Sequence, residues 1–335
     1  MPRGTVRIAD NDNMSLAFEQ MVPGRYQDSD AYLNIVQWNI EWFGAAKSKA
    51  KDIRRVEIVT DILTSFNADL FIFQEIAGPS RDGRYRGVLD SIAEELTVRG
   101  AGDYVVFYTE AGGEQRVAMM WDRDYIRAKS EVSDLFPRGT HKTPDGKDAF
   151  ANRAPLYGHF EARVGAAGRF DFQALGVHLK AMADGAEQRE YSARVLAEWM
   201  QSARVEVDAD ILVVGDWNAP PTAPEWDAIR GLPNVHFDAI NDPSDFSYLW
   251  LENRGRRFVS RIDLAAVSLA SETPVPEVMA GVVRWRPIEE ALSRASGLTD
   301  AEVVRNMREV KETVSDHLPT ITQFYFSPPL EEHRG

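Results

Sequence analysis

The sequence predicts an α+β protein, built as a four-layer α/β/β/α sandwich in which two packed mixed β-sheets are flanked by helices. Short apolar runs rich in β-branched and aromatic residues outnumber the amphipathic helical patterns. The two kinds of segment do not alternate in the uniform βαβ rhythm of a Rossmann sheet or a regular barrel. Several runs are apolar at almost every position, which is typical of strands covered on both faces. These observations together favour two sheets packed face to face with helices outside them.

Eight segments have the composition of β-strands. The predicted strands cover residues 33–38, 69–74, 104–109, 116–121, 156–163, 170–177, 210–215 and 262–268. Most are continuous apolar runs, but 170–177 alternates, with Phe170 and Phe172 opposed to Asp171 and Gln173. This alternation predicts one apolar and one more polar face for that strand.

Two segments, 52–66 and 187–204, carry apolar residues at the three-to-four spacing of amphipathic helices, and a third helix is predicted at 299–313. The third prediction rests on Thr299 and Glu302 three positions later, which is the form of a capping box. The sequence therefore predicts a helix that starts at Thr299.

Composition narrows the class of protein. The 335 residues include no cysteine, which excludes disulfides, Cys-ligated zinc and thiol catalysis. No apolar run reaches the length of about 18 residues needed to span a membrane, and no secretory signal is visible. We therefore expect a cytoplasmic protein unless a signal was removed. We see no linker, so residues 31–326 are predicted to form one domain, with 1–30 and 327–335 as tails.

The net charge is relevant to whether the protein binds nucleic acid. A formal net charge of −14 counts against a protein that coats duplex DNA with a basic face, without excluding DNA as a substrate. Two local basic stretches, 138–153 and 252–261, are either solvated loops or phosphate contacts beside an active site.

Polar side chains stand at or near the ends of the predicted strands. They are Asn39, Glu75, His178, Asp216, Asn218, Asp263, Asp316 and His317. Each one alone could be turn chemistry, a cap or a satisfied core residue. If the strand ends gather at one edge of the sandwich, the whole set converges on one cleft, which is where an active site is expected.

Convergence of the four carboxylates in this set requires compensation. Two carboxylates about 4 Å apart repel by about 4 kcal/mol at an effective dielectric constant near 20. A divalent cation would relieve this repulsion, and all-oxygen ligation favours Mg²⁺, with Mn²⁺ or Ca²⁺ as alternatives. Histidines beside such a site can act as general acids or bases, and Asp263 is a candidate to orient His317.

The stretch I-L-V-V-G-D-W-N at 211–218 makes a more local prediction. Gly215 would let the backbone pass close to its neighbours. If the chain is still extended there, Asp216 and Asn218 point to one side and Trp217 to the other.

Read in order, these motifs resemble those of the endonuclease/exonuclease/phosphatase superfamily, the deoxyribonuclease-I-like fold. The resemblance extends from Asn34 to Phe326. Its motifs are W-N-I-E-W-F-G, F-Q-E-I, N-R-A-P, G-V-H-L-K, G-D-W-N, R-I-D-L and S-D-H-L-P. Any one of them is short, and their number and order make the resemblance specific.

The resemblance implies metal-dependent cleavage of phosphoesters. It assigns Asn39, Glu75 and Asp316 to the metal. It assigns Arg153 of N-R-A-P to a phosphate contact. Asp216 and Asn218 would surround the attacking water and the scissile phosphate. His178 and His317, the latter held by Asp263, would stabilise the pentacovalent phosphorane and transfer protons.

Within the superfamily, two histidines and the R-x-P arginine are more similar to the deoxyribonuclease-I and sphingomyelinase branches than to the abasic-site endonucleases. V-S-R-I-D-L departs from the P-A-W-x-D-R element of inositol-polyphosphate phosphatases. DNA is the expected substrate, and the alternative is a small nucleotide or phospholipid ester. A third possibility is an inactive binding protein on this fold. The segment 264–314 looks longer than the fold needs, so it either shapes substrate choice or is decoration.

Overall fold

The structure is a computed structural model. It describes residues 31–44, 49–66, 68–80, 82, 85–238, 246–251, 257–271, 275–283, 299–306 and 308–326. The predicted tails, 1–30 and 327–335, lie outside the described residues, and the single-domain assignment stays a prediction.

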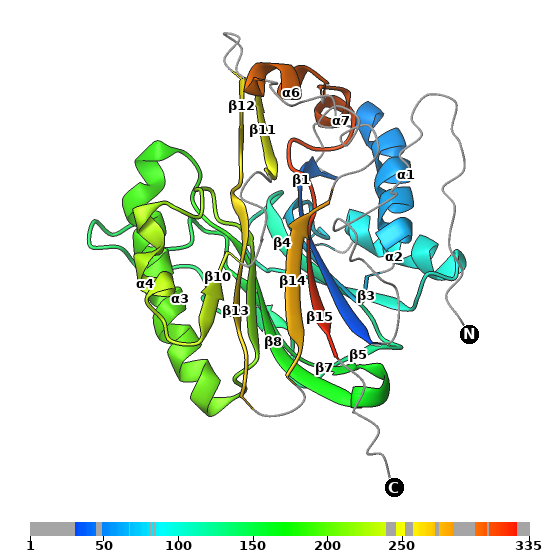
Figure 1. Cartoon of the computed structure of the whole chain (residues 1–335). Helices are drawn as coiled ribbons and strands as arrows, with labels where there is room; N and C mark the ends of the chain where they lie inside the picture. Colours follow the sequence, from blue (N-terminus) through cyan, green and yellow to red (C-terminus); the bar gives the residue numbers. More distant parts are fainter. Residues whose placement is uncertain are drawn as a thin grey trace, which may run out of the picture.

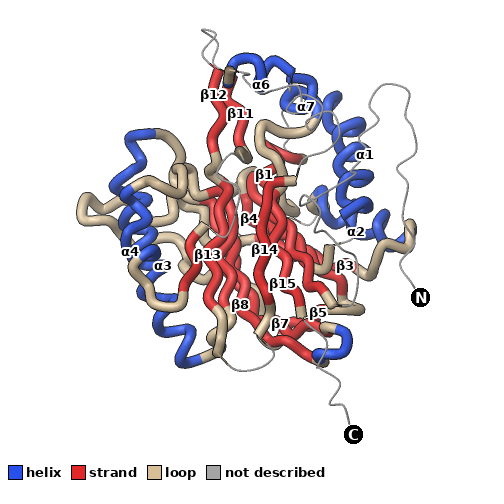
Figure 2. Tube along the Cα trace, in the orientation of Figure 1, coloured by secondary structure: helices blue, strands red, loops and turns tan. Residues whose placement is uncertain are grey.

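Two β-sheets form the middle of the molecule, and helices cover the outer side of each (Figures 1 and 2). The first sheet has the order β14 (Glu277–Val282), β15 (Thr320–Tyr325), β1 (Tyr32–Phe43), β2 (Leu70–Ile76), β4 (Arg116–Asp122), β3 (Tyr104–Tyr108). The second has the order β10 (Val235–Phe237), β13 (Asp263–Ser268), β9 (Ile211–Asp216), β8 (Arg169–His178), β7 (Leu156–Arg163), β5 (Ile126–Ala128), with β6 (Ser133–Asp134) beside β7.

The helices divide between the two outer faces. Helices α1 (Lys49–Phe66) and α2 (Val88–Val98) lie over the first sheet, and α3 (Ala186–Glu206) and α4 (Asp227–Arg230) lie over the second (Figure 1). A small ribbon of β11 (Tyr248–Leu251) and β12 (Arg257–Ser260) stands at one end with α6 (Asp300–Asn306) and α7 (Arg308–Thr313). This is the predicted four-layer sandwich, and the fold class is confirmed. None of the described helices combines the length and apolar character needed to cross a bilayer.

Burial explains why the central strands are apolar throughout. In β2, Leu70 and Ile72 belong to the cluster between the two sheets, whereas Phe71 and Phe73 pack with α1 and α2. In β8, the predicted apolar face of Phe170 and Phe172 likewise lies between the sheets. Both faces of these strands are covered, so alternation between apolar and polar residues disappears from most of them.

All eight predicted strands are present. Strands β14 and β15, the short strands β5, β6 and β10 of the second sheet and the β11–β12 ribbon were not predicted, and neither were helices α2 and α4. The predicted helix 299–313 is divided into α6 and α7, with residue 307 outside the described part. At its start, the Glu302 carboxylate accepts the Thr299 N–H at 2.8 Å, so the reciprocal half of the predicted capping box is present.

Strand directions explain why the polar residues meet. Strands β1 and β2 are parallel, and so are β8 and β9, so each pair ends at the same edge of its sheet. Strands β15 and β13 run antiparallel to β1 and β9 and therefore begin at that edge. The ends of four strands and the starts of two are thus brought to one end of the sandwich, beneath the β11–β12 ribbon (Figure 1).

Candidate active site

A buried hydrogen-bonded chain links the two sheets at this end. His317 Nδ1 lies 2.8 Å from Asp263 Oδ2, and Gln37 Nε2 donates to Asp263 Oδ1 at 2.9 Å. Gln37 is held in turn, because its Oε1 accepts the Thr320 hydroxyl at 2.8 Å. Asp263 is fully buried and His317 is only 5% exposed. The predicted pairing of Asp263 with His317 is therefore present, and both oxygens of the carboxylate are occupied.

The charge of His317 follows from this environment. Burial by itself would lower the pKa of its imidazole, but the charge and hydrogen bond of Asp263, with the charges of Asp216 and Asp316, raise that pKa to about 10. Its other ring nitrogen, Nε2, lies 3.9 Å from oxygens of both Asp216 and Asp316. At neutral pH His317 is thus a cation with Nε2 directed toward the carboxylates.

A second connection between the sheets runs through Asp216. Asn39 Nδ2 donates to Asp216 Oδ2 at 3.0 Å, and His178 Nε2 lies 3.5 Å from the same oxygen. His178 and Asp216 are register partners at the ends of β8 and β9. Burial raises the pKa of Asp216 to about 7, opposed by the charge of His317 and assisted by those of Asp263 and Glu75.

Contact with Arg153 determines the protonation state of the His178 imidazole. Its Nη1 lies 3.0 Å from Nδ1 and 2.5 Å from Nε2 of that imidazole, and its Nη2 donates to the Leu179 carbonyl at 3.0 Å. A guanidinium can only donate, so the ring nitrogen that it contacts must accept, and His178 is neutral. Burial and then the charges of Arg153 and His317 lower the pKa of His178 well below its usual value, in agreement with this geometry. The two histidines are therefore held in opposite charge states.

Three further carboxylates, on Glu41, Glu75 and Asp316, surround this centre. Glu75 Oε1 lies 3.7 Å from His178 Nε2, and Glu75 Oε2 accepts the Trp42 N–H at 3.2 Å. Burial, followed by the charge of Asp316, raises the pKa of Glu41 to about 7. Lys311 Nζ, 3.4 Å from Asp316 Oδ2, offsets part of the negative charge. Carboxylates are in excess over the cations that touch them.

These oxygen donors suit a hard divalent ion. Asn39, Glu75 and Asp316 offer two carboxylates and one amide oxygen, a set to which Mg²⁺ commonly adds waters and substrate oxygens. Within the described residues, no three His, Cys, Asp or Glu side chains are grouped so that they could hold a metal by themselves. The donor chemistry fits Mg²⁺, and coordination would have to be completed by groups other than acidic side chains.

Asn218 is placed differently from its prediction. With φ at 58° it leaves the extended conformation, so the chain turns immediately after β9. Its N–H is accepted by Asp216 Oδ1 at 2.9 Å, and its Nδ2 donates to the Leu179 carbonyl at 3.1 Å. Trp217 does face the other way, into the cluster under α3. The prediction that Asp216 and Asn218 point to one side required an extended chain, and the chain is not extended at Asn218, because the Asp216 carboxylate stabilises a turn there.

Strained backbone is concentrated at this end of the molecule. Nine described non-glycine residues have positive φ, and seven lie within four positions of a candidate site residue. The seven are Glu41, Trp42, Glu75, Ala151, Asn152, Met182 and Asn218. Such conformations cost about 1–3 kcal/mol each and persist where the surroundings hold them in place. These conformations therefore cost stability close to the candidate site residues.

Gln37 and Tyr248 are among the contributors that were not predicted from the sequence. Gln37 interrupts an apolar run and is 1% exposed, and a polar residue inside a buried strand is a signal that could have identified it. Tyr248 lies against His317 with ring centroids 4.7 Å apart. The sequence around Tyr248 carries no signal of this role, because the role depends on a contact between β11 and the distant loop before β15.

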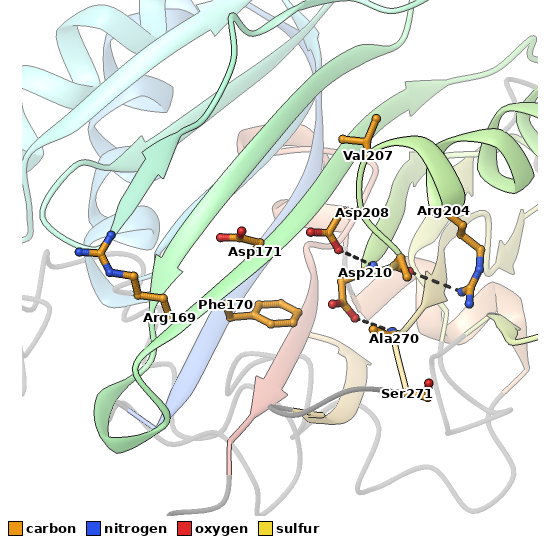
Figure 3. Close-up of a pocket in the computed structure, with 10 residues that line it drawn as sticks. Arg169, Phe170, Asp171, Arg204, Val207, Asp208, Asp210, Ala270 and Ser271 are labelled. Atoms are coloured by element: carbon orange, nitrogen blue, oxygen red, sulfur yellow. Dashed lines mark hydrogen bonds between the residues drawn. The ribbon is translucent and has the colours of Figure 1, made fainter.

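A separate cavity lies away from this cluster of polar side chains. A cavity of 580 Å³ opens between the start of β8, the end of α3 and the residues after β13, lined by Phe170, Asp208 and Asp210 among others (Figure 3). It lies roughly 25 Å along β8 from His178, at the opposite end of the strand. Asp208 accepts the Asp210 N–H and Asp210 accepts the Ala270 N–H. This cavity therefore lies at the end of the sandwich opposite the polar cluster, and none of the histidines of that cluster lines it.

Comparison with solved structures agrees with this architecture. An endonuclease/exonuclease/phosphatase from Bacteroides vulgatus superposes with a TM-score of 0.58 at 16% identity, covering 88% of this chain and 99% of that one. The chain has the endonuclease/exonuclease/phosphatase fold. A mannosyl-6-phosphatase from Bacteroides thetaiotaomicron shares the fold, with a TM-score of 0.57 at 18% identity over 88% of this chain and all of that one. So does TDP2 from D. rerio, solved with a single-stranded DNA product, with a TM-score of 0.56 at 14% identity over 88% and 98%.

No family model and no curated protein matches the sequence. At these identities the solved structures establish the fold, and the resemblance stated from the motifs is confirmed at that level.

Proposed function

We propose that the protein is a divalent-metal-dependent phosphoester hydrolase that cleaves phosphodiesters, with DNA as the first candidate substrate. One observation carries the proposal. Asp216, from the second sheet, is hydrogen bonded to Asn39 of the first sheet and lies 3.9 Å from His317, which Asp263 holds. A carboxylate near neutral pKa, a fixed cationic imidazole and a phosphate-binding arginine in one place are the groups that phosphoester hydrolysis requires.

The charge states of Asp216 and His317 assign them different roles in proton transfer. Asp216, fixed by Asn39, takes a proton from the attacking water as the water oxygen bonds to phosphorus. His317 Nε2 gives a proton to the ester oxygen as the bond between that oxygen and phosphorus breaks. Asp263 holds the imidazole throughout. Pairs of groups whose environments push their pKa values apart are typical of such acid–base roles.

Phosphate binding falls to the other side of the site. Arg153 is buried beside neutral His178, and both can donate hydrogen bonds to non-bridging oxygens as negative charge develops. Asn39, Glu75 and Asp316 would hold Mg²⁺, or Mn²⁺ or Ca²⁺ in its place, and the ion supplies charge stabilisation at the phosphate when bound. Asn218 shapes the turn that carries Asp216.

Nicking of supercoiled plasmid tests the proposal. Wild-type protein is compared with Asp216→Ala and His317→Ala, each with Mg²⁺ and with EDTA. His236→Ala is the matched control, because His236 is exposed on β10. We expect metal-dependent nicking by wild type and by the control, and its loss in both site variants. Cleavage that survives both substitutions would reject the site.

A small phosphate ester is the second candidate. It is supported by the net charge of −14, which disfavours a long polyanion. A neighbour in structure is named as a mannosyl-6-phosphatase. A panel of bis-p-nitrophenyl phosphate, nucleotides, mannose 6-phosphate and phospholipids separates this candidate from DNA. Partner binding without turnover on any phosphoester would instead favour an inactive binding protein.

A further inference from the structure

Tyr248 is fixed over the catalytic imidazole. It forms an isolated antiparallel bridge with His317, and their ring centroids lie 4.7 Å apart with the planes at 48°. Main-chain bonds on either side fix this arrangement, because Leu249 N–H donates to the Asp316 carbonyl at 2.8 Å and Leu318 N–H donates to the Ser247 carbonyl at 2.6 Å. Strand β11 is therefore joined directly to the segment that carries Asp316 and His317.

Hydrogen bonds of the neighbouring Ser247 hold Tyr248 in this position. The Ser247 hydroxyl accepts the N–H groups of Ile262 and Asp263, at 3.2 and 3.1 Å. The residue before Tyr248 is thereby tied to the residue that holds His317. The tyrosine, its histidine and the aspartate partner consequently form one connected unit, although they come from three separate segments.

The hydroxyl of Tyr248 is the part without an assigned role. Within the described residues it has no hydrogen-bond partner, whereas the polar side chains of Gln37, Asn39 and Asp263 in the same site are hydrogen bonded. Burial, and then the charges of Asp316 and Asp216, raise the pKa of this phenol above its ordinary value. An ordinary phenol, with a pKa of about 10, is protonated at neutral pH and can donate.

We propose that Tyr248 contacts the substrate, its hydroxyl donating a hydrogen bond to a non-bridging oxygen of the phosphate while its ring packs on His317. This rests on the proposed phosphoester hydrolase. Carboxylates cannot donate to a phosphate, so the oxygens on their side of the site need another donor. Tyr248 supplies it next to His317, while Arg153 donates beside His178.

Tyr248→Phe tests the role of the hydroxyl, because it keeps the ring packing and removes only the O–H. Loss of one hydrogen bond to a charged oxygen lowers kcat/KM by roughly 10- to 100-fold. Inorganic phosphate, measured by calorimetry with Mg²⁺ present, should bind more weakly in the variant. The unfolding midpoint should stay within about 1 °C, because no internal bond is lost.

Tyr157→Phe is the matched control. The Tyr157 hydroxyl donates to Gln173 Oε1 at 2.9 Å under α3, away from the site. Its removal should lower the unfolding midpoint and leave both kcat/KM and phosphate binding unchanged, which is the reverse pattern.

The outcomes separate this inference from the function on which it rests. If wild type hydrolyses no phosphoester, the proposed function fails. If wild type is active and Tyr248→Phe matches it within twofold in kcat/KM and phosphate affinity, the role of Tyr248 is overturned and the function stands. A loss of activity accompanied by a fall in midpoint as large as that of Tyr157→Phe would also overturn it, because the role would then be structural.

Discussion

His317 Nδ1 and Asp263 Oδ2 lie 2.8 Å apart in the interior, and Gln37 binds the other oxygen of the same carboxylate. Three segments far apart in the chain thus determine the orientation and charge of one imidazole. Because Asp263 cannot turn away without leaving one N–H of Gln37 Nε2 without an acceptor, His317 is held in one ring orientation before any substrate arrives.

Asp263→Asn should reduce kcat/KM by about two to four orders of magnitude, with little change in KM. The amide keeps the shape but loses the negative charge that stabilises the imidazolium and sets its tautomer. Steady-state kinetics on the substrate identified in the panel would measure this. Asp90→Asn is a suitable control, because Asp90, on α2, accepts a hydrogen bond from the hydroxyl of Tyr108 of β3 and, within the described residues, from none of the site residues. A variant within threefold of wild type would contradict the assignment of Asp263.

The same pair should contribute to stability in a defined pH range. The pKa of His317 is raised in the folded protein to about 10, above its unfolded value of about 6.5. The contribution is therefore fully present below pH 6.5 and is lost as the pH rises toward 10. Urea unfolding in EDTA should show wild type exceeding Asp263→Asn most at pH 6 and least at pH 10. An equal difference at both pH values would show that the pair is not charged.

Mg²⁺ should stabilise the folded protein through Glu75. At ten times its dissociation constant an ion that binds only the native state adds about 1.4 kcal/mol, or roughly 2–5 °C in the unfolding midpoint. Glu75→Gln should abolish the shift. Glu94→Gln should retain it, because the Glu94 side chain is exposed on the outer face of α2. Repeating the scan with Mn²⁺ and Ca²⁺ ranks the ions. A shift that persists in Glu75→Gln would place the metal elsewhere.

Asp216→Asn should make the protein less active and more stable. Burial raises the pKa of Asp216 to about 7, so keeping it ionised costs stability that is absent below pH 4 and grows as the pH rises through 7. In EDTA at pH 8 the variant should gain roughly 1–3 kcal/mol, with no gain at pH 4. Activity should fall by at least about 100-fold. Loss of stability at pH 8 would show that Asp216 is instead needed to balance His317 and Arg153.

Much of this site could be predicted from local sequence, because it is built from strand ends. Asn39, Glu75, His178 and Asp216 each follow a buried strand, and parallel pairing carries their side chains to one edge. The strands themselves were recognisable because both faces are covered. Strand β15 was missed because its alternating T-I-T-Q-F-Y is less apolar, although it brings Asp316 and His317 to the same edge.

The remaining contributors depend on contacts that no local pattern encodes. Gln37 meets Asp263 across 226 positions, and Tyr248, at the start of β11, meets His317 through an isolated bridge to the loop before β15. The same holds for charge state. His178 is neutral and His317 cationic because Arg153 contacts one ring and Asp263 the other, and the sequence shows two histidines without distinguishing them.

Gly215 should tolerate no side chain, as the sequence suggested when it predicted a close backbone approach. Its φ is 154°, and a Cβ there would lie 2.0 Å from the Val177 carbonyl oxygen, a main-chain atom that cannot move without breaking the β8–β9 ladder. Gly146→Ala is the matched control, because Gly146 also has a positive φ, 83°, and nothing lies within 4 Å of its Cβ position.

Gly146→Ala should cost about 1–2 kcal/mol from its left-handed backbone. Gly215→Ala should cost at least about 3 kcal/mol or prevent folding, because backbone strain and overpacking add. Urea unfolding of both variants measures the difference, and equal costs would show that β8 and β9 can separate at this point. The substitution should also affect activity, because the next register pair along the ladder is His178 and Asp216. A folded Gly215→Ala protein should therefore lose activity as well as stability, since the same close approach that excludes a methyl group holds these two side chains together.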